Sequence, residues 1–400
     1  MKNTYKLIVL ILFSSLFYLS CDLEENPPFL SEDSVYSDTD GASVALNGIY
    51  SAMTNHFYFG HDYHASTLYM SAMFMGKKSS DIPSIVSLKP LPSQNYTTNF
   101  WQLSYRTIGR ANDMIANVPT DTDNSELNNI LGIAYFLRAH AYLHLVRLYG
   151  GVPLHTEPAT EATLHKERAA VMDVYDLIIA DGKKAESLMF ETQTGGHPTK
   201  YAANMLMAKA YMTMAGNDNS SPYWGMAYDE AIKVYGKYSL VSNYGDLWAS
   251  ESTANNNSES IFEIQFNVEN PSKIGRAFTP NNAYDGTGWE RFRAYPEVVD
   301  AHMARYPGDP RIDFTFTSQY EKYKNGAPTG NFVKVYPATN RTKNNNRFTY
   351  IGKYFIKDQT ASSDATNFNY VQFRYADLLL MLAEIENELN GPAGAYKYVN

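Results

Sequence analysis

The chain has 400 residues, 44% of them hydrophobic, which is enough for one large domain or for about two or three ordinary ones. A formal net charge of −9 argues against nucleic acid or an anionic lipid surface as the partner. The 32 tyrosines are unusual, because each has a flat apolar face and a polar tip, which suit helix packing, wet interfaces and sugar rings.

Residues 1–20 form a predicted signal peptide, in which lysines precede an apolar run at residues 7–19 that is too short for a comfortable membrane span. Cys21 follows and is the only cysteine, so a disulfide within one chain is impossible. A lone cysteine in this position is typical of a lipoprotein, in which the thiol receives a diacylglycerol and becomes the mature N-terminus. The alternative is an ordinary signal peptide with an incidental cysteine, and Tyr18 stands where lipoprotein signals usually have leucine. We predict lipidation of Cys21.

Apolar residues three or four positions apart predict a mainly helical chain. Alanine and tyrosine recur at similar offsets in three of the helices, which predicts repeating helix pairs, as in tetratricopeptide units of about 34 residues. The last predicted helix has no partner after it, so we expect the C-terminal part to be missing. The predicted helices cover residues 41–53, 100–118, 127–149, 171–189, 199–215, 223–238, 374–389 and 393–400.

The helix that starts at residue 127 organises the rest of the chain. Ala134, Ala139 and Ala141 are small enough to let another helix approach. Gly150 can take the left-handed conformation that ends a helix, and Pro153 cannot continue one. We therefore expect this helix to be buried between other helices.

Two long stretches lack helical periodicity. Residues 56–98 and 267–369 are rich in glycine, proline and aromatic residues and are predicted to be mostly irregular. Between them, residues 262–266 alternate apolar and polar, which predicts a strand.

Residues 139–154, AHAYLHLVRLYGGVPL, resemble the hallmark segment of the SusD/RagB family, whose members are lipid-anchored nutrient-binding proteins of the outer membrane. The resemblance implies a mainly α fold, with a tetratricopeptide-like scaffold of helical pairs, a long irregular loop-rich region and a few short strands. It also implies a helical N-terminal region at residues 21–240 and an incomplete C-terminal region at residues 241–400. Further matches lie in residues 101–112, 258–266, 295–300 and 309–311.

Signals for enzymatic chemistry are thin, because the sequence has no nucleophile elbow, no phosphate-binding loop and no dinucleotide fingerprint. Glu259 and Glu263 would stand far apart on a strand, so we favour a structural role over a glycosidase pair. We predict no catalysis, no metal and no cofactor. Two groups of histidines are predicted to pack rather than to bind a metal: His56, His61 and His64 around Asp62, and His140 with His144.

Aromatic residues in the irregular stretches are the candidate ligand contacts, because an exposed ring stacks on a sugar while polar neighbours bond its hydroxyl groups. Trp289 lies in a glycine-flanked loop where no periodicity assigns it to a core. It either grips a ligand or pins its loop to the scaffold, and both alternatives stay open. Trp101, by contrast, is periodic with its helix and is assigned to the core. The candidate ligand residues are Trp289, Tyr284 and Arg291 in one long loop and Asp81, Asn95 and Tyr96 in the other.

The function that the resemblance implies is capture of an oligo- or polysaccharide at the cell surface and delivery to a partner SusC-like TonB-dependent transporter. Acidic residues after Cys21 resemble the surface-export signal of such lipoproteins. Three alternatives stay open: a peptide ligand, as some RagB-like relatives take, a surface glycoside hydrolase, and a scaffold without a small ligand.

Overall fold

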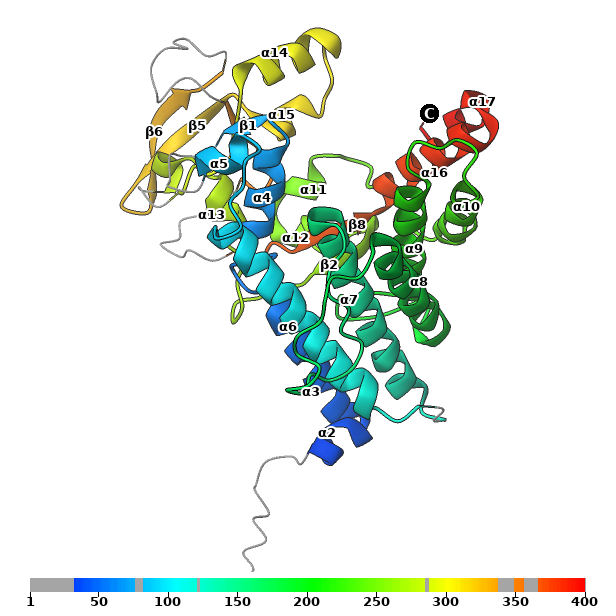
Figure 1. Ribbon diagram of the computed structural model, residues 1–400. Helices are drawn as coiled ribbons and strands as arrows, with labels where there is room; N and C mark the ends of the chain where they lie inside the picture. The colour runs from blue at the N-terminus through cyan, green and yellow to red at the C-terminus, as the bar shows by residue number, and fades with distance from the viewer. Residues whose placement is uncertain are drawn as a thin grey trace, which may run out of the picture.

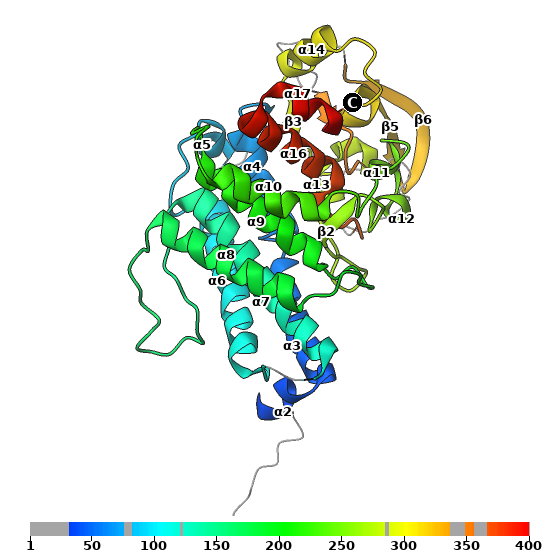
Figure 2. The ribbon, with the colours of Figure 1, turned by 90° about the vertical axis from the view of Figure 1, so that its right-hand side faces the viewer.

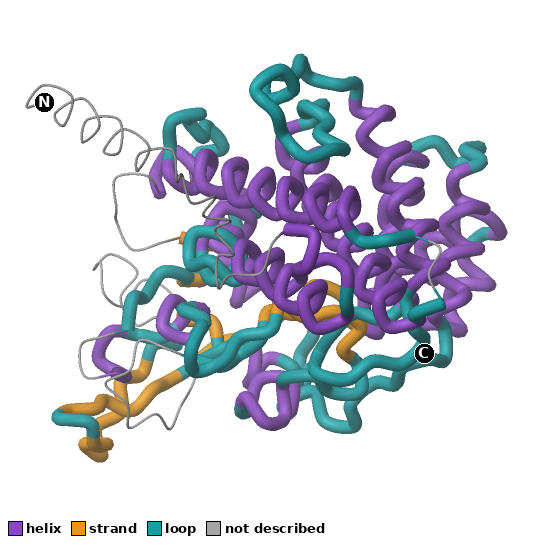
Figure 3. Tube along the Cα trace, turned by 90° about the horizontal axis from the view of Figure 1, so that it is seen from below, coloured by secondary structure: helices purple, strands orange, loops and turns teal. Residues whose placement is uncertain are grey.

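The computed structural model describes residues 32–75, 82–120, 123–284, 288–336, 349–355 and 366–399. The predicted signal peptide, Cys21 and Asp81 lie outside these residues. Within them the chain is mostly helical, as predicted, with the long helices gathered on one side and most of the strands on the other (Figures 1 and 3). None of the helices in these ranges is both long and apolar enough to cross a membrane.

The long helices form a stack in which each packs on the next along the chain (Figures 1 and 2). This arrangement agrees with the predicted scaffold of helical pairs. α2 (Glu32–Ser37) packs on the first helix of the stack. In order, the stack contains α3 (Thr39–Met53), α6 (Asn95–Asn117), α7 (Ser125–Tyr149), α8 (Val171–Leu188), α9 (Lys200–Ala215), α10 (Tyr223–Val234) and α16 (Tyr375–Asn390).

α7 is the centre of this stack, as the sequence predicts. It begins at Asn124, whose side chain accepts hydrogen bonds from the backbone N–H groups of Glu126 and Leu127 and so caps the helix. Its side chains are buried nearly all round from Leu127 to Val146. It ends at Gly150, whose φ of +72° lies in the region that favours glycine.

The other described segments form loops, short helices and three small antiparallel sheets, ordered β1-β3-β7-β4, β2-β8 and β5-β6. Most of them make up a loop-rich region, whereas β2 and β8 pack in the helical stack and α17 and η3 pack on α16. The strands are β1 (Phe74–Met75), β2 (Ser260–Ile264), β3 (Arg293–Ala294), β4 (Phe316–Thr317), β5 (Gln319–Lys324), β6 (Ala327–Lys334), β7 (Thr349–Ile351) and β8 (Tyr370–Arg374). The short helices are α4 (Asp62–Met70), α5 (Ile82–Val86), α11 (Asp246–Ala249), α12 (Glu251–Ala254), α13 (Ile274–Phe278), η2 (Asn281–Tyr284), α14 (Pro296–Arg305), α15 (Ile312–Thr315), α17 (Pro392–Ala395) and η3 (Tyr396–Tyr398).

Several predicted boundaries differ from the structure. α6 begins at Asn95, five residues before the predicted start at residue 100, so Asn95 and Tyr96 belong to a helix and not to a loop. The stretch 56–98 contains α4 and α5. The predicted strand 262–266 lies two residues earlier as β2, and its residues 261–264 are all buried, because β2 is covered on both faces. Predicted helix 393–400 is reduced to α17 and η3.

The described residues form two main hydrophobic cores, one in each region, and a small third cluster around Tyr320, Tyr350 and Phe355. The larger core fills the helical stack and includes β2 and β8, whereas the second lies in the loop-rich region around Tyr69, Phe278 and Phe292. Tyr370 packs against both cores and therefore links them.

Candidate functional site

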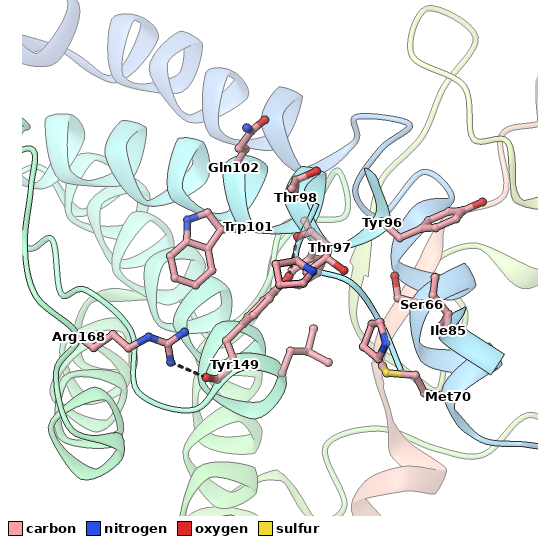
Figure 4. Close-up of a pocket in the computed structure, with 14 residues that line it drawn as sticks. Ser66, Met70, Ile85, Tyr96, Thr97, Thr98, Trp101, Gln102, Tyr149 and Arg168 are labelled. Atoms are coloured by element: carbon pink, nitrogen blue, oxygen red, sulfur yellow. Dashed lines mark hydrogen bonds between the residues drawn. The ribbon is translucent and has the colours of Figure 1, made fainter. Parts of the chain in front are cut away.

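A cavity of about 500 Å³ lies where the start of α6 meets α4, α5 and the end of α7 (Figure 4). Its two walls come from segments far apart in the sequence. Tyr96, Ser66, Ile85 and Met70 lie on one side in the close-up, and Trp101, Tyr149 and Arg168 lie on the other.

Aromatic rings form the stack-side wall. The Trp101 ring stands nearly perpendicular to the Tyr149 ring, at 86° and 5.1 Å between centroids, and lies 5.0 Å from the Tyr105 ring. The Tyr149 hydroxyl donates to the backbone oxygen of Thr97 at 2.8 Å, which fixes the ring. Burial raises the pKa of Tyr149, so its hydroxyl stays protonated. The wall is therefore rigid and largely apolar.

Polar groups surround these rings. Thr97, Thr98 and Gln102 line the cavity from α6. Arg168 donates through Nη1 to the backbone oxygens of Tyr149 at 3.0 Å and of Gly151 at 2.8 Å, and its other N–H groups donate to no residue that the structure describes. None of the described lining residues carries a carboxylate. The cavity thus offers apolar faces and hydrogen-bond donors but no acid or base pair.

A second cavity, of about 580 Å³, shares Trp101 and Gln102 with the first and continues along α6. Its outer wall is the segment after α7. Asn112 holds this segment, because its side-chain amide donates to the backbone oxygens of His155 and Glu157, both at 3.0 Å. Asn112 in turn accepts from Arg138 Nη1 at 2.7 Å. Arg138 also forms a buried, bidentate ion pair with Asp181, with both distances 2.7 Å. The wall is held by this buried network.

The structure brings only some of the predicted ligand residues to the first cavity. Tyr96 lines it, and Asn95 is the exposed residue beside Tyr96 at the start of α6. Asp81 and the side chain of Tyr284 lie outside what the structure describes. Trp101, which the sequence assigns to the core, is half-buried against the helical core and also lines both cavities. The sequence signal that could have indicated this role is the position of Trp101 near the start of its helix, four residues before Tyr105 on the same face.

Trp289 lies in a different place, against the turn before α4. Its ring is 5.7 Å from the His56 ring and 5.4 Å from the His61 ring. The guanidinium groups of Arg276 and Arg291 lie over the indole at 5.1 Å and 5.6 Å from its centroid. The indole is half-buried and so pins its loop, although part of the ring stays accessible.

The backbone around Trp289 is also fixed. The N–H groups of residues 289, 290 and 291 donate to the backbone oxygens of Arg276, Thr279 and Ala277, at 3.0, 3.0 and 2.8 Å. Glu290, between the two ligand candidates, has a φ of +52°, which costs free energy in a non-glycine residue. The loop is therefore strapped to α13 in one conformation.

Glu259, just before β2, and Glu263, within β2, are both buried and hydrogen-bonded to neighbouring protein groups. Glu259 accepts from Arg374 Nη1 at 2.5 Å and from the backbone N–H of Val241 at 3.1 Å. Glu263 accepts from the backbone N–H of Asn256 and the side-chain amide of Asn369, both at 2.9 Å, and burial raises its pKa. Both carboxylates are 2% exposed, so neither can reach a polysaccharide.

The two groups of histidines singled out in the sequence lie in different places. His140 and His144 face each other in the helical core, with their Nε2 atoms 3.2 Å apart, and His140 Nε2 lies 3.0 Å from Gln372 Oε1. His56, His61 and Asp62 meet beside Trp289 and carry groups that can hold a metal ion. His64 is not part of that cluster, because its ring packs against Tyr370 at 3.8 Å.

Two family sequence models match the chain. The model described as "Starch-binding associating with outer membrane" matches residues 37–212, and that of the SusD family matches residues 246–400. SusD-like protein P2 of Formosa agariphila is 26% identical over 426 residues, which covers 99% of this chain and 80% of that protein. SusD-like protein P38 of the same organism is 26% identical over 433 residues, which covers 98% of this chain and 80% of that protein.

Solved structures share the fold. A SusD homolog from Bacteroides thetaiotaomicron gives a TM-score of 0.76 at 23% identity, covering 92% of this chain and 77% of that one. A SusD superfamily protein from Parabacteroides distasonis gives a TM-score of 0.75 at 23% identity, covering 90% of this chain and 79% of that one. A chain crystallised with xylogluco-oligosaccharide gives a TM-score of 0.68 at 18% identity, covering 86% of this chain and 72% of that one.

Proposed function

Because this chain belongs to the SusD/RagB family, we propose that it is a binding protein that holds an oligo- or polysaccharide in the cavity beside Trp101 without reacting with it. The observation that carries this proposal is the pairing of the Trp101 and Tyr149 rings with the polar rim of Thr97, Gln102 and Arg168. Aromatic faces stack on sugar rings, and the rim groups bond their hydroxyls. The structural relative with bound xylogluco-oligosaccharide supports the same ligand class.

The described cavity suits binding better than hydrolysis. Glycosidases need two carboxyl groups about 5–9.5 Å apart across the scissile bond. The described lining of the first cavity has no carboxylate, whereas Glu157 and Glu167 line the second cavity. Glu259 and Glu263 are buried and hydrogen-bonded elsewhere. A peptide ligand is the second candidate, because Arg168 has donors left for a carboxylate.

We further propose that the bound glycan is handed to a SusC-like TonB-dependent transporter and that Cys21 carries the lipid that holds the chain on the outer membrane. The family description associates its members with that membrane. The position of the lone Cys21 directly after the apolar run at residues 7–19 supports lipidation.

The proposal is tested by affinity electrophoresis and calorimetry against a panel of polysaccharides that includes xyloglucan. We expect retarded migration on at least one glycan. Trp101→Ala should weaken binding by at least about tenfold, which corresponds to ~1.4 kcal/mol. Trp101 also packs on the core, so Gln102→Ala, at an exposed position, provides a second variant that leaves the fold intact.

Trp289→Ala is the matched aromatic variant at the other predicted contact. If it abolishes retention while Trp101→Ala does not, the glycan binds at the Trp289 loop and the cavity is not the site. Binding of peptides but of no glycan would favour a peptide ligand, the second candidate. Release of reducing ends from any polysaccharide would overturn the claim that no reaction occurs.

A further inference from the structure

Three side chains with metal-binding groups meet outside the cavity. His56 lies in the turn after α3, His61 is the N-cap of α4, and Asp62 is the first residue of that helix. One ligand atom from each lies within 4.8 Å of the other two. His61 and Asp62 are 3% and 5% exposed, so packing holds both side chains in place.

Two imidazole nitrogens of this cluster have no hydrogen-bond partner. His56 Nδ1 and His61 Nε2 are both buried and bond to no described group. Buried polar atoms without a partner are rare in folded proteins, and a bound ion or water is a common explanation. A neutral imidazole offers the lone pair of such a nitrogen to a metal ion.

The carboxylate of Asp62 orients the His61 ring. Asp62 Oδ1 lies 2.8 Å from His61 Nδ1, and Asn99 Nδ2 donates to Asp62 Oδ2 at 3.5 Å. A carboxylate bonded to one nitrogen of an imidazole fixes the ring and makes it a better ligand, as in many metal sites. Asp62 also contributes the negative charge that a cation needs here, because Lys273 and Arg291 lie near His56.

The donor set selects a class of ion. Ca²⁺ and Mg²⁺ require mostly oxygen ligands, whereas imidazole nitrogens suit Zn²⁺ and related transition metals. Zinc binds imidazole nitrogens at about 2.0–2.1 Å, so the ion would hold the two rings together. His56 is half-buried, which gives its side chain room to move and leaves an opening for water as a further ligand.

We propose that His56 and His61 bind one Zn²⁺ or a similar divalent transition-metal ion through imidazole nitrogens, while Asp62 holds the His61 ring in place through Nδ1. The ion links the turn after α3 to the start of α4. Because the Trp289 ring packs on both imidazole rings, at 5.7 Å and 5.4 Å, the ion also stiffens the surface on which the Trp289 loop rests.

The test uses Zn²⁺ alone and the full chain with Cys21→Ser in every variant, so that no thiol competes for the metal. Calorimetry is expected to give one ion per chain. His56→Gln and Asp62→Asn, which nearly keep side-chain size, should each weaken binding by at least about tenfold. His165→Gln, at an exposed histidine after α7, is the matched control and should leave the affinity unchanged. No binding, or binding that the two cluster variants leave unchanged, would overturn the proposal.

A second measurement needs no change at the metal-binding residues. Cu²⁺ prefers the same nitrogen ligands and quenches nearby indole fluorescence. Cu²⁺ at the cluster should therefore quench Trp289, and Trp289→Phe should remove that part of the quenching while Zn²⁺ still binds. Equal quenching in the unsubstituted chain and in Trp289→Phe would contradict a site beside Trp289.

Discussion

Buried histidines should make this fold sensitive to acid. Burial lowers the pKa of His140 to about 4 and that of His64 to about 3, and it moves the pKa of His144 well below its usual value. As the pH falls below about 6.5, the unfolded chain binds a proton at each of these residues, whereas the folded chain does not. Each therefore lowers the free energy of unfolding by about 1.4 kcal/mol per pH unit, down to its folded pKa.

Urea unfolding at about pH 7 and about pH 5 measures this loss. Carboxylates contribute equally to the pH dependence of stability in all variants. The quantity compared is therefore the change in the free energy of unfolding between the two pH values. His140→Gln should reduce the loss of stability between the two pH values, and the exposed control His165→Gln should not. Equal slopes for the two variants would contradict the assignment of the acid sensitivity to buried imidazoles.

Single residues also show where sequence patterns lose their power. Periodicity gives the direction of a side chain on a helix but not whether something covers it. Trp101 shares a face with Tyr105 and packs on the core, as predicted. It also lines both cavities, because the start of α6 meets α4, α5 and the end of α7 there. Trp289 has no period, and only the structure reveals the two arginines and two histidines around it.

Among the elements, long helices were predictable and short ones were not. α7, α8 and α9 lie within about two residues of their predicted limits, because all three have several turns of periodic sequence and a glycine follows α7 and α9. α4, with nine residues, has too few turns to give a period, and α5 is shorter still. The apolar–polar alternation at residues 262–264 predicted β2, but it does not predict that Glu263 is buried, because β2 is covered on both faces.

Close contact between helices predicts opposite effects for two glycines. A Cβ on Gly182 of α8 would lie 2.5 Å from Met207 Cγ of α9, whereas a Cβ on Gly48 of α3 would meet nothing within 4 Å. Gly182→Ala should therefore destabilise the fold by about 1–3 kcal/mol through overpacking. Gly48→Ala should stabilise it by up to about 1 kcal/mol, because alanine favours a helix. Urea unfolding measures both, and a stabilising Gly182→Ala would show that these helices are not packed so closely.

At the scale of the whole molecule, the cavity lies where the helical stack meets the loop-rich region. Its lining comes from residues 66–102 and 148–168, which no local pattern places together. The sequence could predict the family and the helical scaffold, and it singled out Tyr96, which lines the cavity. It could not predict Tyr149 and Arg168, because their contribution depends on how α7 and the segment after it pack against α6.

Attachment to the membrane and grip on the glycan should be separable, because the cavity is built from residues 66–168 and the lipid is expected on Cys21. A diacylglycerol contributes about 0.8 kcal/mol per buried CH₂, and two acyl chains suffice for stable anchoring. We expect the chain, expressed in a bacterium with a lipoprotein pathway, to incorporate labelled fatty acid and to sediment with membranes. Cys21→Ser should remain in the soluble fraction but retain its glycan affinity.

Trp101→Ala provides the reciprocal control, since it should sediment with membranes and bind glycan poorly. The two variants together distinguish loss of the anchor from loss of the fold, because each keeps the property that the other loses. An unsubstituted chain without lipid would favour the ordinary signal peptide, and the proposed delivery to a membrane transporter would then lose its physical basis. Membrane sedimentation of Cys21→Ser without lipid would instead require another attachment.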